Sequence, residues 1–221
     1  MSRVAGMLLT GGTSRRMGVD KATMLVDGEP AAARLAGLLL SVADPVVEVG
    51  PGHTTLGAVA EQPSGSGPVV AVAAGWRALR RTGGRRPVLT LACDLPLMTR
   101  GLLRWLADRP GDGSVVPVVA GRPQPLCARW SPADLDRMDG LVAAGARAFK
   151  TMYQALDVSF ADEDEWRAAA RPADFSDTDS PEDLQRLGLA MGPAPGRSPV
   201  GVVSGAGGPA RDGRRIHERG A

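Results

Sequence analysis

Two adjacent glycines and three cations follow the first apolar run of the chain. Residues 9–21 read LTGGTSRRMGVDK, and Gly11 and Gly12 come directly after that run. The cations of this segment are Arg15, Arg16 and Lys21. Glycines at such a turn let backbone N–H groups come close to an anion, and cations add positive charge beside them. A double glycine alone is typical of an ordinary turn, but the full segment favours binding of a polyanion such as a nucleoside triphosphate.

The same segment lacks the two commonest phosphate-binding fingerprints. A Walker A loop places Gly-Lys before Ser or Thr, and a dinucleotide-binding loop reads Gly-x-Gly-x-x-Gly. Neither pattern occurs in residues 9–21. A dehydrogenase is therefore the weakest of the functions considered.

An acidic side chain follows the apolar run 87–93, in the order Cys93-Asp94-Leu95-Pro96. Ligands of open α/β sheets bind at the carboxyl ends of the strands, so a carboxylate there can hold Mg²⁺ beside phosphates. In isolation, an aspartate at such a place is more often a turn or capping residue. Beside a phosphate loop from the first strand, we favour metal binding.

A second acidic segment, FSDTDSPEDL, spans residues 175–184. Its Ser180-Pro181 pair predicts the start of a helix, and acids there favour the helix N-terminus. Asp177 and Asp179 precede that helix and could complete a metal site. Taken alone, they are better explained as capping residues.

Short apolar strands alternate with helical stretches along the chain. The patterns predict strands at 4–10, 46–49, 87–93, 115–119 and 124–130. Pro123 and Pro125 place the last of these at an edge or bend of the sheet. Helices are predicted at 31–41, 69–81, 99–107, 132–138, 144–156 and 182–189. The alternation predicts an α/β protein, a Rossmann-like three-layer α/β/α domain with a mostly parallel sheet.

The composition excludes several classes of protein. With 26 Lys and Arg against 24 Asp and Glu, the formal charge of +2 argues against a nucleic-acid binder. Cys93 and Cys127 form no CxxC pair, which argues against zinc and fits buried, reduced thiols. No apolar run suits a signal peptide or a membrane span, so we expect a cytoplasmic protein without a membrane partner.

The end of the chain differs from the rest. Residues 192–221 contain eight glycines, four prolines and five arginines but almost no large apolar side chains. Such a segment cannot offset its own ordering entropy by burial. We therefore predict one folded domain at 1–190 and a disordered Gly/Pro/Arg-rich tail at 191–221.

Taken together, these segments resemble the nucleotidyltransferases that act on molybdenum cofactor. Residues 9–21 are close to the signature loop of that family, and Asp94-Leu95-Pro96 is similar to its metal-binding D-x-P motif. Three further segments are similar to its G-P, Q-P-L and late N-T-P-E motifs; they are Ser66-Gly67-Pro68, Gln124-Pro125-Leu126 and residues 179–184. The resemblance spans residues 4–189, with the motifs in the family's order.

The resemblance implies a reaction and a set of substrates. GTP and Mg²⁺ would bind, and the terminal phosphate of molybdopterin carrying molybdenum would attack the α-phosphate and release pyrophosphate. The product would be the guanine dinucleotide form of the cofactor. Proteins of molybdenum insertion or molybdoenzyme maturation are further partners that it implies.

The resemblance also assigns roles to residues. Lys21, Arg16 and Asp94 would be catalytic, because they neutralise charge, steady the triphosphate and hold Mg²⁺. The groups that would bind the nucleotide are those of Leu9, Thr10, Gly11, Gly12, Lys21, Gly67, Pro68 and Asp94. The metal would be held by Asp94 with Asp179 and Asp177.

Two other functions stay open at this point. One is transfer of CMP or another nucleotide on the same fold, although Gly11-Gly12 is more similar to the guanylyl branch than to the Ala-Gly of the cytidylyl branch. Gln62, where the family often has an acid, and Gly50, where close relatives have Asn, bear on the choice of base. The other is a nucleotide-binding regulatory relative without turnover; the presence of both Lys21 and Asp94 argues against it.

Overall fold

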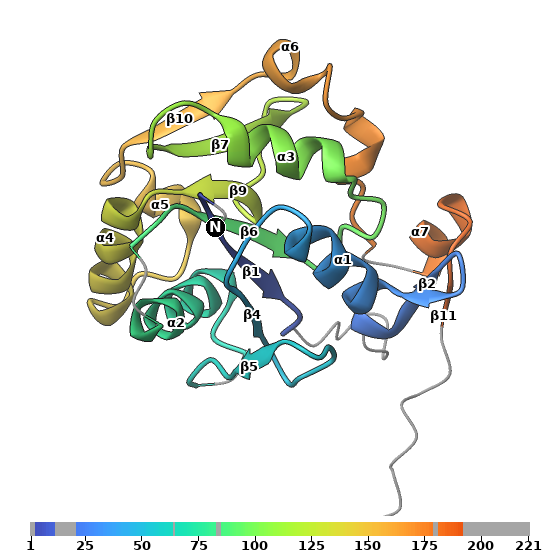
Figure 1. Cartoon of the computed structure of the whole chain (residues 1–221), viewed down its shortest axis with the longest axis horizontal. Coiled ribbons are helices and arrows are strands. Elements are labelled where there is room, and N and C mark those ends of the chain that lie inside the picture. Colours follow the sequence, from blue (N-terminus) through green and yellow to red (C-terminus); the bar gives the residue numbers. More distant parts are fainter. Residues whose placement is uncertain (1–2, 12–20, 64, 83–84, 179–180, 192–221) are drawn as a thin grey trace, which may run out of the picture.

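A mostly parallel sheet forms the centre of the computed structural model, which describes residues 3–11, 21–63, 65–82, 85–178 and 181–191. The strands lie side by side in the order β10-β7-β9-β6-β1-β4-β5, and β8 pairs with β7 (Figure 1). Their bounds are β1 (Ala5–Leu9), β4 (Val46–Val49), β5 (Gly57–Val59), β6 (Val88–Ala92), β7 (Ser114–Val119), β8 (Arg122–Pro123), β9 (Cys127–Trp130) and β10 (Val158–Ala161). All residues of β1 and β6 are buried, which explains why these strands are apolar except for Thr90.

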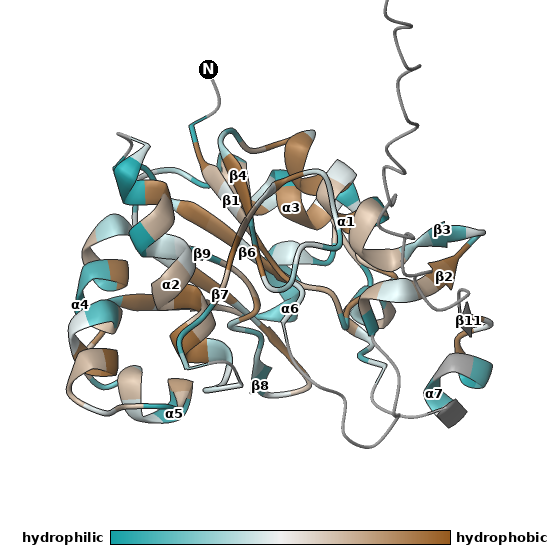
Figure 2. Ribbon diagram, turned by 90° about the horizontal axis from the view of Figure 1, so that it is seen from below, coloured by the Kyte–Doolittle hydropathy of each residue, from teal (hydrophilic) through white to brown (hydrophobic). Residues whose placement is uncertain are grey.

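Helices cover both faces of the sheet (Figure 1). One face carries α1 (Ala31–Leu40), α3 (Arg100–Asp108) and α6 (Glu163–Trp166). The other carries α2 (Pro68–Arg81), α4 (Pro132–Ala143) and α5 (Phe149–Met152). Figure 2 shows mostly apolar strands in the centre and helices that carry both polar and apolar residues around them. The predicted three-layer α/β/α fold is thus confirmed.

Helix α2 lies unusually close to the sheet at Gly75. A Cβ added to this glycine would lie 2.5 Å from the Met7 Cε and 2.7 Å from a methyl group of Val49. Any larger residue would push α2 away from β1 and β4. The close packing fixes where the first turn of α2, at Gly67 and Pro68, stands relative to the ends of those strands.

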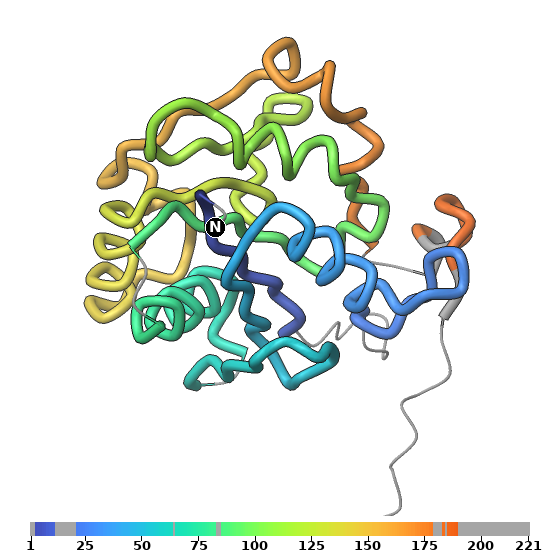
Figure 3. Tube along the Cα trace, in the orientation of Figure 1, coloured from blue at the N-terminus to red at the C-terminus, as the bar shows by residue number. Residues whose placement is uncertain are grey.

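A small antiparallel sheet joins the two ends of the folded chain. Its strands lie in the order β11-β2-β3, with β2 (Met24–Val26), β3 (Glu29–Pro30) and β11 (Ala190–Met191). A 3-10 turn, η1 (Lys21–Thr23), precedes β2, and another, η2 (Pro172–Phe175), and α7 (Pro181–Arg186) precede β11. Figure 3 shows the late segment returning to the first third of the chain. Met191, the first residue of the predicted tail at 191–221, belongs to β11, and residues 192–221 lie outside the described residues.

Two predictions about the middle of the chain are wrong in part: Pro125 does lie in a turn before β9, but the strand is not at an edge, and one predicted helix is shorter. β9 is not an edge strand, because it lies between β6 and β7 and is antiparallel to both. Pro123 and Pro125 precede its first residue, Cys127, and so remove none of its ladder hydrogen bonds. The helix predicted at 144–156 is only α5, because a turn at 144–148 precedes it and another turn follows it.

None of the helices in the part of the chain that the structure describes has the length and apolar character needed to cross a bilayer.

Candidate active site

Several segments with functional side chains meet at one edge of the sheet. β1 is parallel to both β4 and β6, and its last residue, Leu9, pairs with Val49 and Ala92. The residues that follow these three strands therefore lie together at the carboxyl edge. They are the Thr10-Gly11 pair, Gly50 and Asp94.

The end of β1 is held firmly by its neighbour β4. The N–H groups of Thr10 and Gly11 both donate to the Val49 carbonyl, over 3.0 and 3.1 Å. The Leu9 carbonyl accepts from the Cys93 N–H, over 3.0 Å. Any peptide N–H groups of this loop that face an anion must therefore come from residues after Gly11.

The rest of the glycine and arginine loop lies outside the described residues, including Gly12, Arg15 and Arg16. The chain re-enters the structure at Lys21, a half-buried residue that begins η1. Ala22 is buried in the same apolar cluster as Leu8 and Leu95. Lys21 is thus anchored next to a cluster that includes the residue following Asp94.

Asp94 is half-buried, and the loop that carries it is fixed through its backbone. Arg34 of α1 donates through its Nη1 to the carbonyls of Pro96, over 2.9 Å, and Met98, over 3.0 Å. The Asp94 carbonyl itself accepts from the Thr178 N–H over 3.1 Å. The Asp94 loop therefore has little freedom to move.

The late acidic segment lies next to Asp94, although 84 residues separate Thr178 from it in the chain. Thr178 is fully buried, and Asp177 beside it is exposed. A further link is Asp174, which accepts from the Thr99 hydroxyl over 3.3 Å. The structure thus brings Asp177 near Asp94 through Thr178, and Asp179 lies outside the described residues.

The described residues contain no cluster of three or more His, Cys, Asp or Glu that could hold a metal ion by itself. A Mg²⁺ ion commonly needs only one or two carboxylates when substrate phosphates and water supply its other ligands. Asp94 at the strand end, with Asp177 nearby, suits that second kind of site.

Two more of the predicted motif segments reach the same edge. Gly67 precedes α2 with a φ of 98°, a backbone conformation that favours glycine, and Pro68 begins the helix. The Ala92 N–H donates to the Leu126 carbonyl over 2.9 Å, which brings the segment Gln124-Pro125-Leu126 to the end of β6.

Glu48 is a part of this edge that the sequence analysis missed. Its side chain is completely buried, in the middle of β4. Burial raises the pKa of this carboxyl, but hydrogen bonds from Thr10, Thr54 and the backbone of His53 and Thr54 outweigh it and hold the pKa below its ordinary value. The stability that Glu48 contributes is therefore present at neutral pH and is lost as the pH falls through the lowered pKa.

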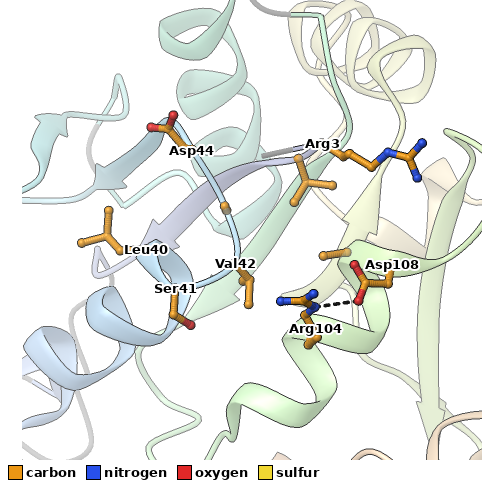
Figure 4. Close-up of a pocket in the computed structure, with 10 residues that line it drawn as sticks. Arg3, Leu40, Ser41, Val42, Asp44, Arg104 and Asp108 are labelled. Carbon is orange, nitrogen blue, oxygen red and sulfur yellow. Dashed lines mark hydrogen bonds and ion pairs between the residues drawn. The ribbon is translucent and has the colours of Figure 1, made fainter. Parts of the chain in front are cut away.

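A cavity of about 340 Å³ lies elsewhere (Figure 4). Its walls are the start of β1, the turn after α1 and the second half of α3, at the amino edge of the sheet. Charges of both signs line it, and Arg104 pairs with Asp108 over 2.6 Å. None of the residues predicted to act on the nucleotide or metal lines this cavity.

Arg34 gives a direct test of how the Asp94 loop is held. Because Arg34→Met leaves two carbonyls without their charged donor, we expect it to lower the free energy of unfolding by about 1–3 kcal/mol. Arg104→Met, which breaks only an exposed ion pair on α3, should cost less than about 1 kcal/mol. Urea unfolding of both variants measures the difference, and equal losses would show that Arg34 does not anchor the loop.

Comparison with known proteins places the chain in a family. A family model described as MobA-like NTP transferase domain matches residues 6–161. A probable molybdenum cofactor guanylyltransferase of Mycolicibacterium paratuberculosis is 33% identical over 166 residues, which are 70% of this chain and 83% of that protein. One of Mycobacterium tuberculosis is 34% identical over 163 residues, covering 70% and 81%.

Solved structures share the fold. The molybdopterin-guanine dinucleotide biosynthesis protein A of Archaeoglobus fulgidus superposes with a TM-score of 0.66 at 21% identity, covering 82% of this chain and 95% of that one. The 2-C-methyl-D-erythritol 4-phosphate cytidylyltransferase of Thermus thermophilus gives 0.56 at 19% identity, covering 84% and 97%. At these identities the likeness is one of fold alone.

Proposed function

We propose that this chain uses GTP and molybdopterin carrying molybdenum as its substrates. The chain belongs to the family of MobA-like NTP transferases and is a nucleotidyltransferase of the molybdenum cofactor guanylyltransferase type. It would transfer GMP to the terminal phosphate of the cofactor and release pyrophosphate. The base, the acceptor and the residue roles below are part of this proposal.

One observation carries the proposal: the ends of β1, β4 and β6 lie in register at one edge of the sheet. Three of the motif segments that support the assignment follow β1 and β6 or precede α2 at this edge. The family's curated relatives named above are guanylyltransferases by name, which supports GTP as the donor.

The reaction forms one bond and breaks another at the α-phosphorus of GTP. An oxygen of the cofactor's phosphate attacks, and the bond from the α-phosphorus to the bridging oxygen of the β-phosphate breaks. Such in-line transfer needs positioning and charge neutralisation more than covalent catalysis. Lys21 would neutralise charge at the α-phosphate, and Arg16 would steady the triphosphate.

The proposed cofactor is Mg²⁺, because a carboxylate at a strand end together with phosphate oxygens is an oxygen-only ligand set of the kind that this ion prefers. Asp94 would hold it, with Asp179 and Asp177 completing the site directly or through water. When bound, the ion would offset negative charge on the phosphates.

Other groups would border the nucleoside and its acceptor. The backbone of Leu9, Thr10, Gly11 and Gly12 would lie on one side, and Gly67-Pro68 at the start of α2 on the other. Proteins that insert molybdenum or mature molybdoenzymes would supply the acceptor or receive the product.

The test is pyrophosphate release by purified protein with Mg²⁺, molybdopterin carrying molybdenum and each nucleoside triphosphate in turn. We expect GTP to exceed CTP, ATP and UTP in kcat/KM by at least about tenfold, because a binding site discriminates through hydrogen bonds to the base. Comparable turnover of CTP would overturn the choice of base. Binding of GTP without turnover would indicate a regulatory protein instead.

A further inference from the structure

We propose that Glu48 is a positioning residue for nucleotide binding, because its buried carboxylate joins the end of β1 to the loop 50–54 in one fixed arrangement. The inference rests on the proposed function, since it takes the end of β1 as part of the nucleotide site. It assigns to Glu48 an effect on nucleotide affinity and no part in the chemical step.

The carboxylate of Glu48 is satisfied entirely by neutral donors. Its Oε1 accepts from the Thr10 hydroxyl over 2.5 Å, from the Gly52 N–H over 3.1 Å and from the His53 N–H over 2.7 Å. Its Oε2 accepts from the N–H and the hydroxyl of Thr54, over 2.9 and 2.6 Å. A buried carboxylate with five donors is a strong constraint on the segments that supply them, because each hydrogen bond to a charged group is costly to lose.

The five donors come from two different segments. One is Thr10, directly after β1, and the others belong to the loop that follows β4. Glu48 lies between them in the sheet, because it pairs with Leu8 of β1 on one side and Ala58 of β5 on the other. Its side chain therefore ties the end of β4 to the end of β1, although 38 positions separate Glu48 from Thr10 in the chain.

The backbone at Gly50 packs closely against the end of β1. A Cβ added to Gly50 would collide with the Thr10 Oγ1 and lie 2.7 Å from the Gly11 nitrogen. The Gly50 N–H also donates to the Val59 carbonyl over 2.9 Å. Only glycine therefore fits at position 50 against Thr10 and Gly11 as the Glu48 network holds them.

A strand end that is already fixed in the free protein favours binding, because the chain loses less conformational entropy when the ligand binds. The Thr10 side chain is committed to Glu48, and the N–H groups of Thr10 and Gly11 are committed to the Val49 carbonyl. These two residues can therefore offer a ligand only their backbone carbonyls, whose positions the Val49 hydrogen bonds and the Glu48 network set together. Losing the network would let these groups move in the free protein, and binding would have to restore their order. The expected result is weaker nucleotide binding with little change in the rate at saturation.

Two substitutions break the network from opposite sides. Glu48→Gln keeps the size of the side chain but replaces an acceptor oxygen by a donor, and Thr10→Val removes the hydroxyl. We expect each to raise the Kd for Mg²⁺-GTP by about tenfold, which corresponds to the loss of one charge-assisted hydrogen bond. The kcat of each variant should change by less than about threefold. Because both act through one network, the double variant should bind within about twofold of Glu48→Gln. Thr54→Ser keeps the hydroxyl that donates to Oε2 of Glu48 and should bind like the wild type.

Asp134→Asn is the matched control for loss of a buried carboxylate. Asp134 is 1% exposed and accepts from the hydroxyls of Ser114 and Ser131 and from the Asp157 N–H. Asp134 lies in α4, four residues after Trp130. Trp130 pairs with Val88, the first residue of β6, so Asp134 lies near the edge of the sheet opposite the candidate site. Asp134→Asn should lower stability in urea as Glu48→Gln does, with the Kd unchanged.

Calorimetric titration with each of the four nucleoside triphosphates and Mg²⁺ separates the possible failures. Wild-type Kd for Glu48→Gln, additive losses in the double variant, or equal weakening in Asp134→Asn would overturn the inference about Glu48. Tight binding of CTP in place of GTP would overturn the proposed base, and the same variants would then be compared with CTP. A wild-type protein that binds none of the four would overturn both proposals.

Discussion

Replacing Asp94 by alanine is expected to lower GTP-dependent pyrophosphate release by about a hundredfold to a thousandfold, the usual loss when a group that stabilises transition-state charge is removed. The side chain follows β6 at the carboxyl edge of the sheet, and Arg34 and Thr178 fix the loop through main-chain carbonyls. Since the substitution leaves those carbonyls in place, the backbone of the loop should keep its conformation while the metal loses a ligand. Steady-state kinetics at several Mg²⁺ concentrations measure this.

Asp108→Ala is the control for the loss of one carboxylate. Asp108 is an exposed acid at the end of α3 that pairs only with Arg104 among the ion pairs of the described residues. It should keep wild-type turnover, and its free energy of unfolding should change by no more than about 0.5 kcal/mol. Unchanged activity of Asp94→Ala would remove Asp94 from the metal site. Unfolding of the variant under assay conditions is checked by circular dichroism.

The fold could be predicted to the extent that local patterns decide it. The strands at 46–49 and 115–119 and the helices at 31–41 and 69–81 agree with β4, β7, α1 and α2 to within a residue or so at each end. Here apolar periodicity and proline or glycine boundaries coincide with the tertiary structure. The strand predicted at 124–130 starts three residues before β9, because the turn that contains Pro125 comes first.

Elements that depend on distant partners were not predictable in the same way. β2, β3 and β11 are two or three residues long, and β11 pairs with a strand more than 160 positions earlier. So short a segment has no periodicity to read, because its conformation is decided by the strand that it joins. The approach of Thr178 to Asp94 is likewise a tertiary contact that no local pattern encodes.

The residues of the candidate site also divide into those that a local sequence pattern reveals and those that depend on tertiary contacts. Asp94 and Gly67-Pro68 were singled out because a strand end and a helix start are visible in the sequence. Glu48 carries a signal that the sequence analysis does not use, because it is an acid inside an otherwise apolar strand, Val46–Val49. A charge in such a strand requires buried donors, and Thr10 and Thr54 at the adjacent loop ends are the residues able to supply them.

Replacing Lys21 by alanine is expected to lower turnover about as much as the loss of Asp94, by about a hundredfold to a thousandfold. Lys21 and Lys150 are the only lysines among the 26 Lys and Arg of the chain. Lys21 begins the short helix after the glycine loop and is half-buried. Lys150 is exposed on α5, so Lys150→Ala is the matched control and should turn over GTP like the wild type.

The more informative change at this position is Lys21→Arg, because it keeps the charge and alters only its shape. An ammonium is a compact point charge suited to one phosphate in a narrow site, whereas a guanidinium is a wide planar fork. We expect Lys21→Arg to retain GTP binding but to lose roughly tenfold or more of kcat, since the misplaced charge no longer meets the α-phosphate in the transition state. Full activity of Lys21→Arg would mean that any cation suffices there. In a chain that uses arginine almost everywhere else, the lysine at position 21 would then need another explanation.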